Sequence, residues 1–293
     1  MTMLDVELSL RRSADAFNGY LAEALPQGED VISQAMRYSL EGGGKRVRPA
    51  LAASFCELFG AQAQRVYPLA AALEMVHTYS LIHDDLPCMD DDDYRRGRFS
   101  CHREFGEAAA LLAGDALLTR AFQLIAETEH YSAEVRCQAI VLLSRAAGAE
   151  GMIGGQWLDL QYESVRAARP QLEEMNRKKT GALIAVACQF GCLAASADEA
   201  QTEAALRYAD AVGLLFQVTD DILDAVGKQG KTGKTSGKDK ASGKSTWVTI
   251  LEMQNAKALA WELAARAERE IAPYAGEDHL LIHLPGWLAE REY

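Results

Sequence analysis

The feature that most constrains the fold is the spacing of the apolar residues, which recur at intervals of three and four along nearly the whole chain. Leu69, Leu73 and Val76 form one such series. This spacing places apolar side chains on one face of an α-helix. Alternating runs of Val, Ile and Thr are essentially absent, and only seven prolines interrupt the pattern. The sequence therefore predicts an all-α fold, and because no linker or repeat divides it, we expect residues 1–293 to form a single domain.

Composition and charge exclude several classes of protein. The chain has 293 residues, 49% of them hydrophobic, and a net charge of -12. An acidic chain of this kind has no electrostatic reason to bind nucleic acid or an anionic membrane. It contains no run of 18 apolar residues and no N-terminal signal-like segment, so we expect no membrane span and no secretion. The six scattered cysteines are interpreted as free thiols, which favours a cytoplasmic location.

The first of two acidic clusters follows an apolar helical segment. Asp84, Asp85 and Asp90 lie there in the spacing D-D-x-x-x-x-D. Pro87 lacks an N–H group and its ring clashes with the preceding turn. We therefore expect the helix to end near this proline and Asp90 to return toward Asp84. The next three aspartates, at 91–93, are predicted to form a solvated turn.

The second cluster lies on a predicted helix over residues 211–226. Its acidic stripe contains Gln217, Asp220, Asp221 and Asp224, on a different face from the apolar residues. A solvated face is the alternative interpretation, but carboxylates one turn apart repel each other and no lysines intersperse them here. Two clusters of carboxylate oxygens predict magnesium, which binds carboxylates, water and substrate phosphates. An EF-hand is excluded because its glycine and final glutamate are missing.

Basic residues accompany both clusters. They are Lys45, Arg46, Arg48, Arg95, Arg96 and Lys179. The first three follow glycines 42–44, which allow a backbone to approach an anion, and Lys179 precedes Thr180 at a predicted helix bend. Each cation alone would be read as a solvated surface charge. Together, beside a metal cluster, they predict a phosphorylated substrate, and we expect the arginines to serve that substrate rather than to neutralise the aspartates.

The segment 227–246 is rich in Gly and Lys and has no large apolar residue. It is predicted to be a mobile, cationic loop. Its GKT and GKS tripeptides resemble part of a nucleotide-binding P-loop. The first glycine of that motif is replaced at each register, by Ala225, Lys228 and Lys238, and a helix precedes the loop instead of a strand. A nucleotide triphosphatase is therefore rejected.

With these motifs in place, the chain resembles the short-chain trans-isoprenyl (polyprenyl) diphosphate synthase family, most closely the bacterial-type farnesyl diphosphate synthases. The resemblance rests on GGGKRVRP, MVHTYSLIHDDLPCMDDDDYRRG, GMIGGQWLDL, RKKTGALI, FQVTDDILD and GKST. It implies an isoprenoid-synthase helical bundle around a deep central cavity, usually as a homodimer. It also implies magnesium-dependent, head-to-tail condensation of isopentenyl diphosphate with dimethylallyl or geranyl diphosphate, giving the C15 product farnesyl diphosphate.

The resemblance also implies roles for individual residues. Three Mg²⁺ ions would be held by Asp84, Asp90 and Asp220, with Asp85, Asp221 and Asp224 as ligands or supports. Arg95, Lys179 and Lys234 would bind the allylic diphosphate. Lys45, Arg48, His77 and Arg96 would bind isopentenyl diphosphate, with Lys244 as a further phosphate contact. Thr180 and Gln217 would line the reacting centre. For His77 a core histidine is the alternative, but its place two turns before Asp84 favours a ligand.

Product length is predicted at the helix before the first cluster. In the family, an aromatic residue five positions before the first aspartate, here Tyr79, goes with a C15 product. Helical spacing places Ser80 nearer the line below Asp84, so Tyr79 is assigned as the floor by resemblance. The alternatives are a geranyl or geranylgeranyl diphosphate synthase, a terpene cyclase or a non-catalytic partner subunit. The C-terminal segment LPGWLAEREY matches the family weakly.

Overall fold

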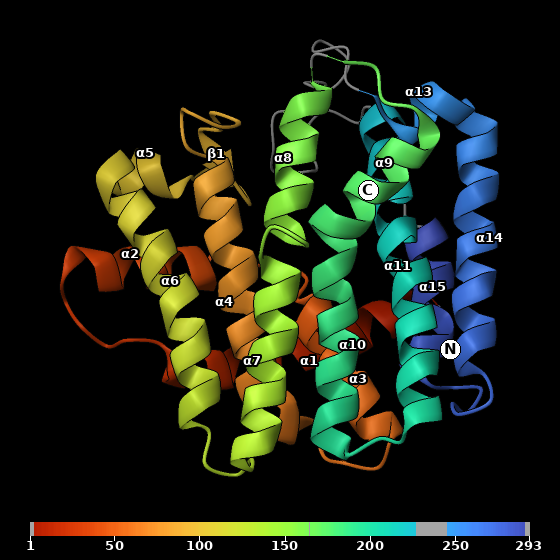
Figure 1. Ribbon diagram of the computed structural model, residues 1–293, viewed down its shortest axis with the longest axis horizontal. Helices are drawn as coiled ribbons and strands as arrows, with labels where there is room; N and C mark the ends of the chain where they lie inside the picture. The colour runs from red at the N-terminus through yellow and green to blue at the C-terminus, as the bar shows by residue number, and fades with distance from the viewer. Residues whose placement is uncertain (1–2, 164, 227–244, 291–293) are drawn as a thin grey trace.

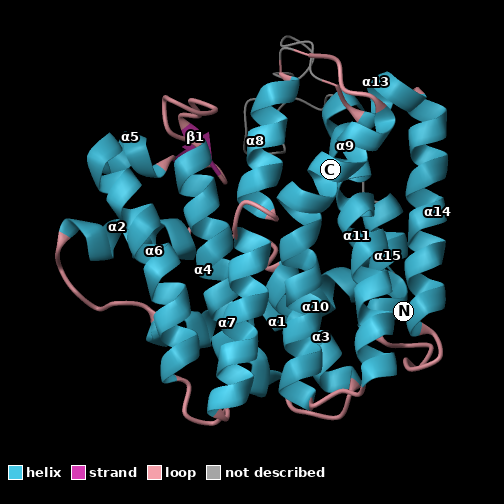
Figure 2. Cartoon of the chain, viewed as in Figure 1, coloured by secondary structure: helices cyan, strands magenta, loops and turns pink. Residues whose placement is uncertain are grey.

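The chain folds into a bundle of long helices that lie roughly side by side (Figures 1 and 2). The computed structural model describes residues 3–163, 165–226 and 245–290. The helices of its first half are α1 (Met3–Ala24), α2 (Val31–Glu41), α3 (Val47–Leu58), α4 (Tyr67–Asp84), α5 (Cys101–Phe105), α6 (Glu107–Glu127) and α7 (Ala133–Ala147). The second half contributes α8 (Met152–Tyr162), α9 (Arg169–Asn176), α10 (Ala182–Ala195), α11 (Glu199–Val226), α13 (Trp247–Leu251), α14 (Met253–Ile271) and α15 (Leu280–Glu290). The predicted all-α fold is confirmed.

Helix α4 lies at the centre of the N-terminal half. Its series Leu69, Leu73 and Val76 is fully buried, and its flanking alanines are buried as well. The helix packs against α3, α6 and α10, and also contacts α1 and α2. A helix that is apolar on every side must be enclosed by other helices. The acidic end of α4 is consequently held by a rigid part of the core.

Helix α11 is the corresponding element of the C-terminal half. It packs against α10, α14 and α15 through a buried stripe that includes Val212, Leu215 and Val218. The C-terminal ends of α4 and α11 lie at the same end of the bundle, at the top of Figure 1. The two acidic clusters, which are separated by more than 100 residues in sequence, therefore open toward the same end of the molecule.

A two-stranded hairpin is the exception to the helical prediction. Strands β1 (Tyr94–Arg95) and β2 (Arg98–Phe99) pair in antiparallel fashion, with Arg95 opposite Arg98. The two turn residues, Arg96 and Gly97, both have positive φ, as a tight hairpin turn requires. Strands of two residues are too short to give a recognisable alternating pattern in the sequence.

By length and composition alone, α6 could cross a membrane. This is weak support for a membrane span, because the core helix of a globular protein meets the same criteria. One face of α6, which includes Ala113, Leu117 and Ala121, is fully buried and packs against α4 and α2. The packing accounts for much of its apolar composition.

Candidate active site

The first acidic cluster is shaped by the end of α4. Asp84 is the last residue of the helix, and the Asp90 N–H donates a 2.8 Å hydrogen bond to the Asp84 carbonyl oxygen. The chain after Pro87 therefore folds back, as predicted. Asp91, with a positive φ of 49°, completes the reversal. The prediction of a solvated turn is wrong for Asp92, which is buried.

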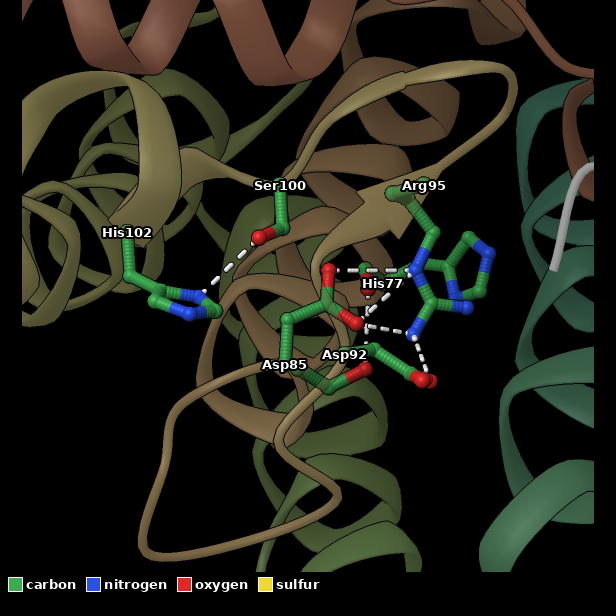
Figure 3. Close-up of polar contacts among 7 residues, drawn as sticks. His77, Asp85, Asp92, Arg95, Ser100 and His102 are labelled. Carbon is green, nitrogen blue, oxygen red and sulfur yellow. Dashed lines mark hydrogen bonds and ion pairs between the residues drawn. The ribbon is translucent and has the colours of Figure 1, made fainter. Parts of the chain in front are cut away.

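Asp85 is held by a protein cation. The Arg95 guanidinium donates from Nε to both carboxylate oxygens, at 3.0 and 3.1 Å, and from Nη2 to Oδ1. Asp92 lies 4.0 Å from Arg95 Nη2 on the same side (Figure 3). Burial lowers the pKa of Arg95, but the hydrogen-bonded Asp85 carboxylate outweighs it and the net pKa is raised. The expectation that the arginines would not neutralise the aspartates is therefore wrong for Arg95.

The glycine segment before α3 forms a close contact with the hairpin. Gly43 and Gly44 have positive φ values of 87° and 116°. The Arg96 guanidinium donates to the Gly43 carbonyl oxygen, and a Cβ atom on Gly44 would lie 2.7 Å from Arg96 Cζ. A side chain at position 44 would therefore displace the Arg96 guanidinium, and the positive φ also favours glycine. The segment thus places Arg96 beside the cations that begin α3.

Arg48, near the start of α3, lies close to acids on both α4 and α11. Burial lowers the pKa of Arg48, and the nearby carboxylates of Glu74 on α4 and Asp220 on α11 oppose that shift. Within the described part of the chain, the buried Nε of Arg48 has no hydrogen-bond partner. A buried guanidinium with an unused donor is suited to receive an anion. Lys45 is exposed, and its ammonium group lies 5.2 Å from the centre of the Trp287 ring on α15.

His77 lies within this group of cations. Its pKa is held well below the ordinary value, first by burial and then by Arg48, Arg96, Arg95 and Arg46. Figure 3 shows the His77 ring beside the Arg95 guanidinium. The imidazole is therefore neutral near pH 7, and it can donate a hydrogen bond to a phosphate without adding a charge.

The predicted helix bend is a π-helical turn over Arg177–Gly181, between α9 and α10. A π-turn inserts an extra residue into a helix and often marks a functional site. Helix α8 packs closely against this turn: a Cβ atom on Gly155 would lie 2.1 Å from the backbone nitrogen of Lys179. The turn presents two side chains, Lys179 and Thr180, and the hydroxyl of Thr180 donates to Gln217 Oε1 at 3.1 Å. The bend thus joins Thr180 to α11.

The second acidic cluster has a member that is held by the backbone. Asp221 Oδ2 accepts a 2.7 Å hydrogen bond from the Trp247 N–H, and its Oδ1 accepts from Gln217 Nε2 at 3.3 Å. Asp221 therefore matches Asp85, since each is the second aspartate of its cluster and each is bound by a protein donor. Asp220 is exposed at the end of the bundle and Asp224 is partly exposed. Lys234 and Lys244 lie outside the described residues.

The donor chemistry fits magnesium. In residues 3–163, 165–226 and 245–290, no three Asp, Glu, His or Cys side chains converge closely enough to hold a metal by themselves. Magnesium does not need such a cage, because it usually takes one or two carboxylates and completes its shell with water and substrate phosphates. Asp84 lies near Arg95 and Asp220 near Arg48, which is consistent with that mode of binding.

The two residues predicted to set product length differ in environment. Tyr79 is buried, its ring packs edge-to-face on His83 with the ring centres 5.6 Å apart, and its hydroxyl has no partner among the described residues. Burial, with a smaller effect of Asp84, raises the pKa of Tyr79 to about 12. Ser80 turns its hydroxyl back to the His77 carbonyl oxygen at 2.8 Å.

Sequence reasoning missed two buried acids that pair with cations in this region. Asp159 on α8 lies 2.5 Å from Lys179 Nζ, and Glu74 on α4 lies 2.6 Å from Arg46 Nη1. Arg46 was expected among the cations that accompany a phosphorylated substrate, whereas its guanidinium donates to Asn18, Glu74 and the Leu40 carbonyl oxygen. The available signal was a lone acid within an apolar segment, as in AALEMVH and GQWLDLQ, since an unpaired buried carboxylate is costly.

Comparisons with known proteins agree with this geometry. The sequence model of the polyprenyl synthetase family matches residues 29–272. The farnesyl diphosphate synthase of Geobacillus stearothermophilus is 41% identical over 298 residues, with all of both chains covered. An FPP/GFPP synthase structure from Zymomonas mobilis superposes with a TM-score of 0.87 at 32% identity, covering 98% of this chain and 100% of the other. A Helicobacter pylori geranyltransferase, complexed with magnesium and isoprenyl diphosphate, gives a TM-score of 0.83 at 30% identity, covering 97% and 96%. These similarities confirm the predicted isoprenoid-synthase fold, and the chain belongs to the polyprenyl synthetase family.

Proposed function

We propose that the protein is a prenyltransferase that condenses isopentenyl diphosphate with dimethylallyl diphosphate, and then with geranyl diphosphate, to give farnesyl diphosphate. The observation that carries this proposal is the shared end of α4 and α11. There, two carboxylate clusters meet Arg48, Arg96 and His77, and Arg48 retains a buried donor. The Geobacillus stearothermophilus relative, which is 41% identical to this chain, is named a farnesyl diphosphate synthase, and this supports the same substrates.

The chemistry requires a diphosphate to leave from an allylic carbon. In each condensation a bond forms between C1 of the allylic substrate and C4 of isopentenyl diphosphate, the C1–O bond breaks, and C2 of the isopentenyl unit loses a proton. Magnesium, when bound, stabilises the charge of the departing diphosphate. We assign three ions, with Asp84 and Asp90 on one side and Asp220 on the other. Asp85 and Asp221 support these clusters through their own protein partners.

The cations divide between the two substrates. Lys179 and Arg95 hold the allylic diphosphate, and Lys234 is assigned to the same group. Lys45, Arg48, Arg96 and neutral His77 bind isopentenyl diphosphate, with Lys244 as a further contact. Binding both diphosphates at fixed positions aligns C1 with C4 and lowers the entropic part of the barrier.

Thr180 and Gln217 act at the reacting carbons. The Asp221 carboxylate can only accept hydrogen bonds, so it fixes the Gln217 amide with Nε2 toward Asp221 and Oε1 toward Thr180. Their oxygen lone pairs therefore lie close together and can stabilise the positive charge that develops on the allylic group. The released diphosphate is available to accept the C2 proton, so the mechanism needs no further carboxylate.

The C15 length is assigned to Tyr79, whose buried aromatic ring packs edge-to-face on His83. Ser80 is the next residue on α4, but its hydroxyl is hydrogen-bonded to the backbone. We therefore assign it a smaller effect on product length. A geranyl or geranylgeranyl diphosphate synthase remains the alternative within the family.

The test is incubation with isopentenyl diphosphate, dimethylallyl diphosphate and Mg²⁺, followed by mass analysis of the dephosphorylated products. The expected product is C15, and a chelator of divalent cations should abolish it. A C10 or C20 product would support the alternative chain lengths. A cyclic hydrocarbon, or no elongation, would overturn the proposal.

We also propose a cytoplasmic homodimer. All six cysteines are free, which fits a reducing compartment. Leu111 and Leu112 on α6 are 47% and 53% exposed, and Val141 on α7 is 45% exposed. Exposed apolar groups of this kind favour an interface between copies. Sedimentation of the wild-type protein and of Leu112→Glu should give a dimer and a monomer, respectively.

A further inference from the structure

Arg46 anchors the segment that carries the isopentenyl-diphosphate cations. It lies immediately before α3 in a left-handed conformation, with a φ of 48°, and is only 4% exposed. Its guanidinium donates to the Asn18 side chain at 3.0 Å, to Glu74 at 2.6 Å and to the Leu40 carbonyl oxygen. One side chain therefore joins the ends of α2 and α3 to α1 and α4.

Glu74 is the buried acid at the centre of this arrangement. It is 2% exposed, and its carboxylate lies 2.6 Å from Arg46 Nη1. It also lies near enough to Arg48 and Arg96 for its charge to oppose the effect of burial on the pKa of each. A single buried carboxylate thus acts on three guanidinium groups, and of these three only the Arg46 group is hydrogen-bonded to it in the described part of the chain.

An isolated buried carboxylate is strongly unfavourable, so it takes the nearest available cation. Without Arg46, the cations within reach of Glu74 are Arg48 and Arg96. Both guanidinium groups are attracted by the negative charge of Glu74. The Nε atom of Arg48 has no hydrogen-bond partner among the described residues. A guanidinium that turned toward Glu74 would be lost to the substrate.

We propose that Arg46 is a positioning residue for isopentenyl diphosphate: by occupying Glu74, it keeps Arg48 and Arg96 directed at the diphosphate. The inference rests on the proposed function of the site. It gives a specific role to a buried cation that does not itself touch the substrate, and it makes Glu74 the group whose removal should restore binding when Arg46 is lost.

The test uses Arg46→Met, Glu74→Gln and the double variant, because methionine keeps an unbranched stem without the charge and glutamine keeps an acceptor for Arg46. Initial rates are measured with each substrate varied in turn. Arg46→Met should raise KM for isopentenyl diphosphate at least tenfold, while KM for geranyl diphosphate and kcat stay within threefold. Glu74→Gln alone should leave both KM values within threefold of wild type. The double variant should return KM for isopentenyl diphosphate to within threefold of wild type, because the capturing charge is gone.

A merely structural ion pair gives a different pattern. An equal rise of both KM values in Arg46→Met, or a double variant that stays as weak as Arg46→Met, would overturn the proposal. If Arg46→Met does not fold, a tenfold rise of KM for isopentenyl diphosphate in Glu74→Gln would overturn it as well, and an unchanged KM there supports it. Arg207→Met, which breaks a surface ion pair with Glu270, is the matched control.

Calorimetric titration of the same variants with isopentenyl diphosphate separates this proposal from the proposed function. It measures binding without turnover, so the expected order of affinities stands even if the enzyme does not elongate that substrate. Failure of wild-type elongation would count against the function. A loss of the expected order of affinities would count against the role of Arg46.

Discussion

The ammonium group of Lys179 lies 2.5 Å from Asp159 Oδ2, across the contact between the π-helical turn and α8. Asp159 is buried, whereas Lys179 is partly exposed. A lysine side chain is long and flexible, so a fixed carboxylate partner defines where its charge lies. We therefore expect Asp159→Asn to raise KM for the allylic diphosphate at least tenfold, because the loss of a charge-assisted hydrogen bond is worth about 1.5–3 kcal/mol. Initial-rate kinetics with geranyl diphosphate varied would measure this.

The matched control for that prediction is Glu174→Gln. Glu174 pairs with the adjacent Lys178 at 2.8 Å, but it is exposed on α9, and exposed pairs contribute little. The control should change neither KM. If Asp159→Asn affected the two substrates equally, Asp159 would be supporting the fold rather than Lys179.

Tyr79→Ala should lengthen the product to C20 or beyond. The ring of Tyr79 is buried on α4, and replacing it with a methyl group leaves space that a longer tail can occupy. Mass analysis of the dephosphorylated products, with isopentenyl diphosphate in excess, would detect the change. Unchanged product length would contradict the hypothesis that the Tyr79 ring limits the length of the product.

Tyr79→Phe separates the ring from the hydroxyl. The buried hydroxyl has no partner among the described residues, so its removal should keep the C15 product. It should also leave the free energy of unfolding unchanged or raise it by about 1 kcal/mol, as measured by urea denaturation. A longer product from this variant would assign the control of length to the hydroxyl.

The parts of the site that could be predicted from sequence are those set by local chemistry. The period of the apolar residues gives the helices, and Pro87 predicts the reversal that returns Asp90 to Asp84. The bend at Lys179 follows from the local sequence as well. In each case the cause lies within a few residues of the effect, so the sequence contains it.

The parts that could not be predicted depend on contacts between distant segments. Asp85 receives Arg95 because the hairpin folds back onto the end of α4. Glu74 and Arg46 meet across 28 positions, and Asp159 and Lys179 across 20. A lone acid in an apolar helix indicates that a cationic partner is needed, but tertiary packing determines which cation it is.

Gly44→Ala should weaken the binding of isopentenyl diphosphate. A Cβ atom there would meet Arg96 Cζ at 2.7 Å, and a φ of 116° strains any residue but glycine. Gly43→Ala carries the strain alone, since nothing lies within 4 Å of its Cβ position although its φ is 87°. Both variants should lose about 1 kcal/mol or more of stability, but only Gly44→Ala should raise KM for isopentenyl diphosphate, by about tenfold. Equal KM values for the two variants would show that Arg96 moves aside without loss.

His77 predicts a specific dependence of stability on pH. Burial and four arginines hold its pKa well below the ordinary 6.5 in the folded protein, whereas the unfolded chain titrates near 6.5. The unfolded state therefore binds a proton that the folded state does not, so His77 makes the folded state lose stability as the pH falls below 6.5. The loss approaches about 1.4 kcal/mol per pH unit. Above that pH the contribution is constant, because the imidazole is neutral in both states.

His77→Gln removes the titrating group but keeps a hydrogen-bond donor. Between pH 6.5 and 5.5 the free energy of unfolding should fall by about 1 kcal/mol more in the wild type than in this variant, as measured by urea denaturation in the absence of substrate. Saturating inorganic diphosphate should reduce the difference, because an anion beside His77 favours its protonated form. Parallel pH profiles for the two proteins would mean that His77 is already exposed to solvent or paired with an acid. In that case it could not act as the neutral donor to isopentenyl diphosphate.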